Sequence, residues 1–239
     1  MQRRYVTVDV FTDRPLGGNP LAVVLDAGGL STAQMQAIAS EFNYSETTFV
    51  LPPRDSAHDA QVRIFTVNNE IPFAGHPNVG TAFVLATQAS KPVARFLFEE
   101  IAGLVPVDIL KEDGNPVGAE LTAPQPLKKL TSFSAEEAAA CVSLSAADVR
   151  TDRHPPQIAS VGMAFLVAEL ASHAAHGQST GDGVVRAAGC KNAPLTQGVQ
   201  FPASYLRERG RELRQHSSVT RNASDLVHAS NTVRLSQTV

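Results

Sequence analysis

Hydrophobic residues alternate with other residues in several short stretches of the chain, as they do in β-strands that have one buried face. In residues 5–11, Val6, Val8 and Val10 alternate in this way and predict a strand. Clusters of Gly and Pro separate this stretch from others of the same kind. The further predicted strands are Leu21–Leu25, Thr47–Leu51, Gln61–Thr66, Arg95–Glu99, Leu104–Leu110, Val117–Leu121, Gln157–Val161 and Phe165–Glu169.

Helical spacing of apolar residues appears in two segments between these strands. The first predicts a helix over 32–42, with Ser31 suited to be its N-cap. The second predicts a helix from Val79 to about Thr87, with Pro77 as its first residue. Its surface is almost entirely apolar, so we expect it to be buried on most sides.

Many short strands with few buried helices predict an α+β fold rather than a doubly wound α/β sheet. A short Ala-rich helix, opened by the capping-box residues Ser134 and Glu137, fits the same class. The pair Gly17-Gly18 has neither the spacing nor the following helix of a dinucleotide-binding loop. The sequence therefore gives no sign of a nucleotide cofactor.

The composition is that of an ordinary globular protein, with 43% of the 239 residues hydrophobic and 18% charged. A net charge of −3 gives no reason to expect nucleic acid as a partner. The first residues resemble a strand rather than a signal peptide, and no apolar run is long enough to span a membrane. Cys141 and Cys190 lack zinc-site spacing, so we expect no metal and reduced thiols in a cytoplasmic protein.

The balance of acidic and basic residues changes from acidic to basic near residue 172. Residues 1–172 contain 12 Lys and Arg against 19 Asp and Glu, whereas residues 173–239 contain 8 against 4. The second stretch also holds four of the seven His residues, and its hydrophobic patterning is weak. We interpret residues 173–239 as a divergent segment or a tail produced by a frame disruption. An exposed extension with a basic face is the alternative.

Glu46 is the first candidate for chemistry, because it lies between a predicted helix and a predicted strand. A carboxylate at the end of an element can project into a cleft, where desolvation raises its pKa into a range useful for proton transfer. The local sequence by itself favours an ordinary solvated Glu in a loop.

Gly75 and His76, which lead into the second predicted helix, are the other candidates. A glycine permits close approach of a ligand, and the free N–H groups of a helix start bind anions. His76 adds a hydrogen-bond donor or a titrating group. Taken alone, the local sequence favours a His that caps the helix or packs beside it.

Several sequence blocks, in this order, resemble the phenazine-biosynthesis (PhzF-like) isomerase family of the diaminopimelate-epimerase-like superfamily. They are Val8–Thr12, Pro15–Val23, Phe42–Val50 and Asn69–Pro77, and the similarity continues to about residue 170. The resemblance implies two similar α+β domains, each a curved sheet around a central helix, with the active site between them. Residues 1–115 would form the first domain and residues 116–172 would begin the second.

The resemblance also implies an activity. In the family, a Glu moves a proton between ring carbons of trans-2,3-dihydro-3-hydroxyanthranilate, and Glu46 matches that Glu by motif. Gly75 and His76 match the loop that holds the substrate. The predicted function is therefore a cofactor-independent isomerase acting on a small carboxylated metabolite, commonly as a homodimer.

The family's second-domain loop, which reads like Asp-Pro-Ala-Thr-Gly-Ser-Ala, has no match in this sequence. A catalytically incomplete remnant or a small-molecule-binding pseudoenzyme is therefore the alternative function. A third option is an amino-acid racemase or epimerase. It is disfavoured because related epimerases use two cysteines, and neither Cys141 nor Cys190 lies at the Gly75-His76 loop.

Overall fold

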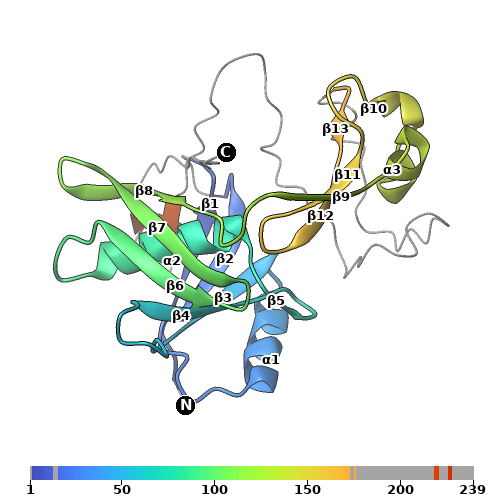
Figure 1. Cartoon of the computed structure of the whole chain (residues 1–239). Helices are drawn as coiled ribbons and strands as arrows, with labels where there is room; N and C mark the ends of the chain where they lie inside the picture. Colours follow the sequence, from blue (N-terminus) through green and yellow to red (C-terminus); the bar gives the residue numbers. More distant parts are fainter. Residues whose placement is uncertain (1, 13–15, 173–174, 176–217, 221–225, 228–239) are drawn as a thin grey trace. The chain divides into compact units, whose positions relative to one another are not determined.

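The computed structural model describes residues 2–12, 16–172, 175, 218–220 and 226–227. The chain divides into two compact units, one formed by Met1–Pro124 with Arg209–Val239 and the other by Gln125–Glu208. Figure 1 labels the helices and strands of both units. Cys190 and most of the segment 173–239, for which the sequence predicts a divergent tail, lie outside the described residues.

The first unit contains one mixed sheet with the strand order β15-β14-β1-β2-β3-β4-β6-β7-β8, and β5 pairs with β4. Its strands are β1 (Tyr5–Val10), β2 (Asn19–Val24), β3 (Glu46–Leu51), β4 (Ala60–Phe65), β5 (Glu70–Ile71), β6 (Arg95–Glu100), β7 (Gly103–Glu112), β8 (Asn115–Leu121), β14 (Ser218–Thr220) and β15 (Leu226–Val227). The pairs β2–β3 and β4–β6 are parallel, which requires a crossover connection. Helices α1 (Thr32–Phe42) and α2 (Gly75–Gln88) lie in these crossovers, and the α+β class predicted from the sequence is confirmed.

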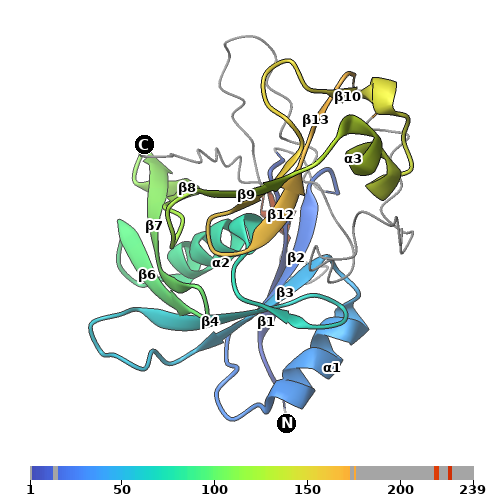
Figure 2. The ribbon, with the colours of Figure 1, turned by 45° about the vertical axis from the view of Figure 1, so that its right-hand side comes forward.

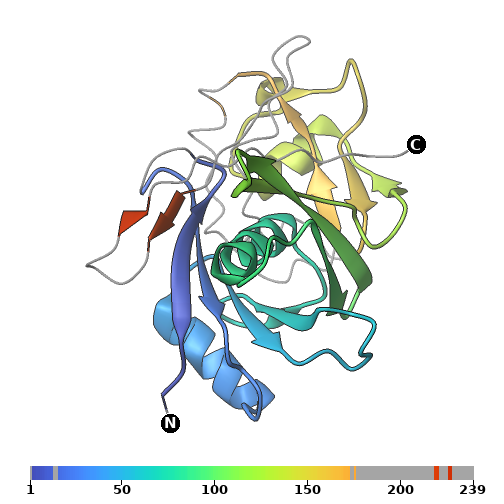
Figure 3. The ribbon, with the colours of Figure 1, turned by 90° about the vertical axis from the view of Figure 1, so that its left-hand side faces the viewer.

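Helix α2 is the centre of the first unit. Figure 3 looks nearly along its axis and shows the strands of the sheet curled around it. The helix contacts β1, β2, β3, β7 and β8, and it is buried almost continuously from His76 to Val84, which confirms the predicted burial. It begins at Gly75 rather than Pro77, so that prediction was wrong. A proline fits anywhere in the first turn, where its missing N–H is not needed.

Gly80 allows α2 to lie close against β1 and β2. A Cβ atom at this position would lie 2.6 Å from Leu21 Cδ2 and 2.9 Å from Val10 Cγ2. Both neighbours are completely buried and have little room to shift. We expect Gly80→Ala to lower the free energy of unfolding by about 1–2 kcal/mol, because overpacking outweighs the better helix propensity of Ala. Urea unfolding measures the change, and wild-type stability would contradict the tight contact.

Helix α1 covers the opposite face of β3, as Figure 2 shows. Met35 and Ala39 of α1 pack with Phe49 of β3 and Phe65 of β4. A capping box at Ser31 starts the helix, and the helix predicted over 32–42 is confirmed. Because side chains alternate along a strand, successive residues of β3 face α1 and α2 in turn.

The second unit, described by itself, contains a three-stranded sheet in the order β12-β11-β9 and the helix α3 (Ala135–Cys141). Its strands and short elements are β9 (Lys128–Ser132), η1 (Ala146–Asp148), β10 (Val149–Arg150), β11 (Gln157–Ser160), β12 (Ala164–Val167) and β13 (Glu169–Leu170). Ile158 and Leu166 of the sheet pack with Ala138 and Ala139 of α3. The sequence does not predict β9, because all five of its residues are exposed and no buried face marks the strand.

Candidate active site

Glu46 is the first residue of β3, where it lies beside Leu21 of β2. Thr48, two residues further along, faces α2, and its Oγ1 lies 2.8 Å from Thr81 Oγ1. Glu46 is on the same face of the strand, so its side chain points inward, toward α2. Its Oε2 atom is buried. Glu46 is therefore not the solvated loop residue that the local sequence alone favours.

His76, in the first turn of α2, is the neighbour of this carboxyl. Its Nε2 lies 3.1 Å from Glu46 Oε2, and the two side chains are only 8% and 15% exposed. The distance is within the range of a hydrogen bond, but neither atom forms one among the described residues. In an enzyme without its substrate such contacts are often loose and tighten when the substrate binds.

Asn19 fixes the orientation of the His76 ring. The Ser45 hydroxyl donates to Asn19 Oδ1 at 2.6 Å, and Asn19 Nδ2 lies 3.3 Å from His76 Nδ1. Because the Asn19 oxygen already accepts from Ser45, its amide nitrogen is the donor to Nδ1. A neutral imidazole that accepts at Nδ1 carries its proton on Nε2. The network therefore places the ring proton of His76 on Nε2, the nitrogen that lies 3.1 Å from Glu46 Oε2.

Burial favours the uncharged form of both residues. It raises the pKa of Glu46, and the Ser45 hydroxyl counters part of that rise. It lowers the pKa of His76 to about 3. At neutral pH His76 is therefore neutral, and the only charge that the pair can carry is the negative charge of Glu46.

Gly75 opens α2, and its predecessor Ala74 provides no side-chain cap for the helix. A Cβ atom at Gly75 would find nothing within 4 Å, so packing does not require a glycine there. The open space lies beside the first N–H groups of the helix, which favour a bound anion. The structure thus brings the three residues selected from the sequence, Glu46, Gly75 and His76, to one place.

Asn19 and Ser45 also belong to this site, although they are not singled out by the sequence. Each lies in one of the blocks that carry the family resemblance. Taken alone, each is a polar residue typical of a turn. Asn19 meets His76 across 57 positions of sequence, and only the fold creates that contact.

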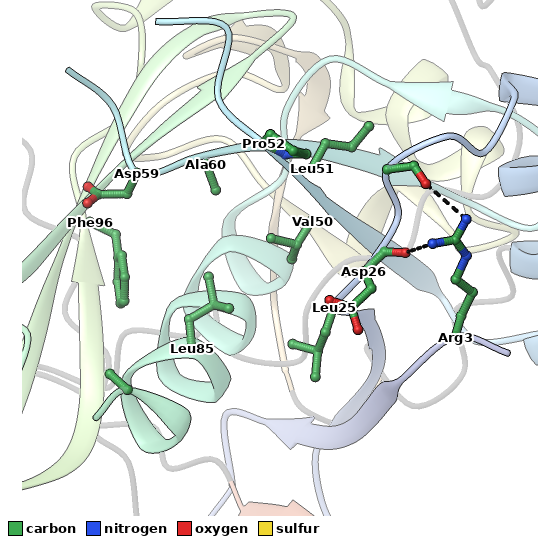
Figure 4. Close-up of a pocket in the computed structure, with 12 residues that line it drawn as sticks. Arg3, Leu25, Asp26, Val50, Leu51, Pro52, Asp59, Ala60, Leu85 and Phe96 are labelled. Atoms are coloured by element: carbon green, nitrogen blue, oxygen red, sulfur yellow. Dashed lines mark hydrogen bonds between the residues drawn. The ribbon is translucent and has the colours of Figure 1, made fainter. Parts of the chain in front are cut away.

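A cavity of 510 Å³ lies at the other ends of β3 and α2 and is separate from this site (Figure 4). Val50 and Leu51 at the end of β3 and Leu85 near the end of α2 line it. Figure 4 shows Arg3 at its edge, where the guanidinium donates to the carbonyl oxygen of Asp26 at 2.7 Å. The cavity is largely apolar and includes neither Glu46 nor His76.

Three observations concern the remaining predictions. In the described part of the chain, no group of three His, Cys, Asp or Glu residues is placed to hold a metal ion. None of the described helices is both long and apolar enough to cross a membrane. Cys141 lies at the end of α3 and packs against the hydrophobic cluster of the second unit, whereas Cys190 lies outside the described residues, so the predicted reduced thiols stay a prediction.

A mixed sheet curled around a buried helix, with a carboxyl facing the start of that helix, is the α+β fold of epimerase-like proteins. The structure of a predicted epimerase from Pseudomonas aeruginosa is 33% identical, covers 74% of this chain and 62% of its own, and has a TM-score of 0.64. A PhzF-family phenazine biosynthesis protein from Bacillus anthracis is 29% identical, with 75% and 60% covered and a TM-score of 0.57.

The chain belongs to the phenazine biosynthesis-like (PhzC-PhzF) protein family, whose sequence model matches residues 8–194. The resemblance seen in the sequence blocks is therefore confirmed. A trans-2,3-dihydro-3-hydroxyanthranilate isomerase from Pseudomonas aeruginosa is 40% identical over 174 residues, which are 72% of this chain and 62% of that protein. The matched part of the chain thus spans less than two thirds of that relative's length.

Proposed function

We propose that this protein is a cofactor-independent isomerase that moves a proton between two carbons of a small carboxylated metabolite. The observation that carries the proposal is the buried Glu46 carboxyl, 3.1 Å from a neutral His76 at an uncapped helix start. Relatives named trans-2,3-dihydro-3-hydroxyanthranilate isomerase support this class of reaction. That compound is therefore the first substrate to test.

Glu46 is the proton shuttle in this proposal. Its carboxylate takes a proton from a substrate carbon, so that a C–H bond breaks, an O–H bond forms, and the electron pair enters the conjugated system of the substrate. The same carboxyl then returns the proton to a different carbon and regains its negative charge. The raised pKa of Glu46 makes its carboxylate a stronger base than one in water. The His76 Nε2–H stabilises the carboxylate before the first transfer and after the second.

The first turn of α2 binds the substrate carboxylate. A helix start offers N–H groups and the positive end of the helix dipole to an anion. The open space beside Gly75 admits the anion. A carboxylate held there is close to His76, and the adjacent carbons of the substrate lie within reach of Glu46.

The direct test is incubation of the wild-type protein with trans-2,3-dihydro-3-hydroxyanthranilate in D₂O. We expect the substrate to isomerise and deuterium to enter the carbon positions between which the proton moves, as seen by ¹H NMR. Absence of both isomerisation and deuterium incorporation, under conditions where binding is detected, would contradict an isomerase. That result would instead support a binding protein without turnover.

The binding protein is the second candidate, because the family's second-domain loop has no match in the sequence. Isothermal titration with the same compound and with simple aromatic carboxylates measures binding, and the presence or absence of turnover in D₂O then separates the two candidates. A racemase is the third and weakest candidate, since neither Cys141 nor Cys190 belongs to the Gly75-His76 loop. The cytoplasmic location, expected from the cysteine content, and the homodimer, implied by the resemblance, remain predictions, and light scattering checks the dimer.

Gly75→Ala tests the anion site against the fold. The added methyl group meets no neighbour, so we expect the free energy of unfolding to change by less than about 0.5 kcal/mol. The same methyl group takes space from the substrate, and we expect its Kd to rise by about tenfold, since overpacking costs about 1–3 kcal/mol. Gly80→Ala is the matched control, with lower stability and unchanged affinity. Wild-type affinity in Gly75→Ala would contradict this binding mode.

A further inference from the structure

Phe11, the residue that follows β1, has a backbone conformation that bulky residues rarely adopt. Its φ angle is +68°, in the left-handed region where the Cβ atom of an L residue is crowded. Glycine and asparagine adopt this region much more easily. Strain of this kind is concentrated at functional sites, where the surrounding structure maintains it. The presence of a large side chain at this position therefore requires an explanation.

Two contacts within the connection between β1 and β2 hold Phe11 in this conformation. The buried Asp9 carboxyl accepts a hydrogen bond from the Leu16 N–H at 2.7 Å. Gly18 lies so close to the end of β1 that an added Cβ atom would be 2.5 Å from the carbonyl oxygen of Val10. Val10 is the last residue of β1, so these contacts fix the chain directly before Phe11.

The ring of Phe11 contacts the imidazole of His76. The two ring centroids lie 6.2 Å apart and the ring planes meet at 63°, an edge-to-face arrangement that aromatic pairs prefer. Asn19, at the start of β2, holds the imidazole at one nitrogen only, over a distance of 3.3 Å. A ring held at one atom can still turn about that contact. The Phe11 ring provides a second contact, which restricts the turn.

We propose that Phe11 is a positioning residue of the candidate site: its ring holds the His76 imidazole in the one orientation that serves both polar neighbours of that imidazole. In this orientation Asn19 donates to Nδ1, and Nε2 lies 3.1 Å from Glu46 Oε2. The ring contact restricts rotation about the Cβ–Cγ bond of His76, so the imidazole carries its proton on Nε2 alone. The inference rests on the proposed function, in which this proton stabilises the Glu46 carboxylate.

Three substitutions of Phe11 separate the role of its ring from the backbone strain. Phe11→Gly removes the ring and releases the strain, Phe11→Leu removes the ring but keeps apolar volume, and Phe11→Tyr keeps the ring. Leu16→Gly is the matched control, because Leu16 lies in the same connection, has a φ of +61° and is 93% exposed. Urea unfolding first identifies the variants that are folded. If Phe11→Gly does not fold, Phe11→Leu decides the outcome in its place.

Two measurements at pH 7, where His76 is neutral, follow the imidazole and the reaction. The ¹⁵N chemical shifts of Nδ1 and Nε2 of His76 report which nitrogen carries the proton. The rate of substrate deuteration, measured over a range of substrate concentrations, gives kcat and KM separately. The first measurement needs no substrate, so it is independent of the proposed function.

In the wild type, Phe11→Tyr and Leu16→Gly, we expect the proton on Nε2 alone and similar rates. In Phe11→Gly and Phe11→Leu we expect ¹⁵N shifts averaged between the two tautomers. Their kcat should fall by about 10- to 100-fold with little change in KM, because misplacing a group of the site by about 1 Å can cost about 10²-fold.

A proton that stays on Nε2 alone in both Phe11→Gly and Phe11→Leu would overturn the inference. A loss of rate in Phe11→Tyr or Leu16→Gly equal to that in Phe11→Gly would overturn it too, because the ring would then not be the cause. If the wild type deuterates no substrate, the proposed function fails, and the ¹⁵N shifts alone decide whether Phe11 holds the imidazole.

Discussion

Glu46→Gln is expected to lower the rate of substrate deuteration by about 10²–10⁴-fold, the usual contribution of a general acid–base group. Gln has the shape of the protonated carboxyl, but its amide neither takes up nor returns a proton at neutral pH. Binding should change little, because the substrate carboxylate is held by the first turn of α2. The loss should therefore appear in kcat rather than in KM.

Stability distinguishes this loss from damage to the fold. Burial raises the pKa of Glu46, so the folded protein prefers the protonated carboxyl. The associated stability is fully present below the pKa of the unfolded chain and is lost as the pH rises through the folded pKa. Gln imitates the favoured form at every pH. At neutral pH the variant should thus unfold at a urea concentration equal to or above that of the wild type.

Glu41→Gln provides the matched control, since Glu41 is exposed on α1. It should retain the wild-type rate and stability. Deuteration by Glu46→Gln at the rate of Glu41→Gln would show that another group moves the proton. A stable Glu46→Gln variant with a large loss of rate is the result that assigns the shuttle to Glu46.

The sheet and its central helix could be predicted because burial leaves a periodic record in the sequence. Val6, Val8 and Val10 alternate with other residues along β1, and the almost entirely apolar surface of α2 predicts that this helix is buried. Where an element has no periodic pattern of buried residues, its existence or its limits cannot be predicted from the sequence. The exposed strand β9 and the start of α2 at Gly75 are examples, because their residues are polar, small or unsuited to a periodic pattern.

The candidate site also contains residues that the sequence could identify and residues that it could not. Glu46, Gly75 and His76 could be selected because they belong to motifs that resemble a known family. The partner Asn19 could not be, since it meets His76 of α2 only through the fold of the sheet. Local sequence also gives the wrong environment for Glu46. Only the register of β3 with β2 shows that its side chain turns inward.

His76→Gln is expected to change how stability depends on pH. In the folded protein the pKa of His76 is lowered from 6.5 to about 3 by burial. Between these values the unfolded chain binds a proton that the folded chain does not. The folded state therefore loses stability as the pH falls below 6.5, by about 1.4 kcal/mol per pH unit. Gln does not titrate, so the variant lacks this loss.

Other groups also titrate as the pH changes, but they are present in both the wild type and His76→Gln. Their contributions to stability therefore cancel when the two proteins are compared. The raised pKa values of Glu46 and Glu100 act in the opposite direction, because their stability is lost as the pH rises. The pKa of Glu99 is lowered to about 2, so its stability is lost only as the pH falls below that of an unfolded Glu. Between pH 6.5 and pH 4.5, the difference in the free energy of unfolding between the wild type and the variant thus reports the titration of His76.

At pH 7 we expect His76→Gln to be less stable than the wild type, because it leaves part of a buried site unfilled. Between pH 6.5 and pH 4.5 the wild type should lose roughly 2–3 kcal/mol more than the variant, so the two curves from urea unfolding converge. Parallel curves would mean that His76 accepts a proton inside the folded site. The imidazole would then face Glu46 as a cation, and the carboxylate would be too strongly stabilised to serve as the base. The pH dependence of folding therefore tests the protonation state on which the proton shuttle depends.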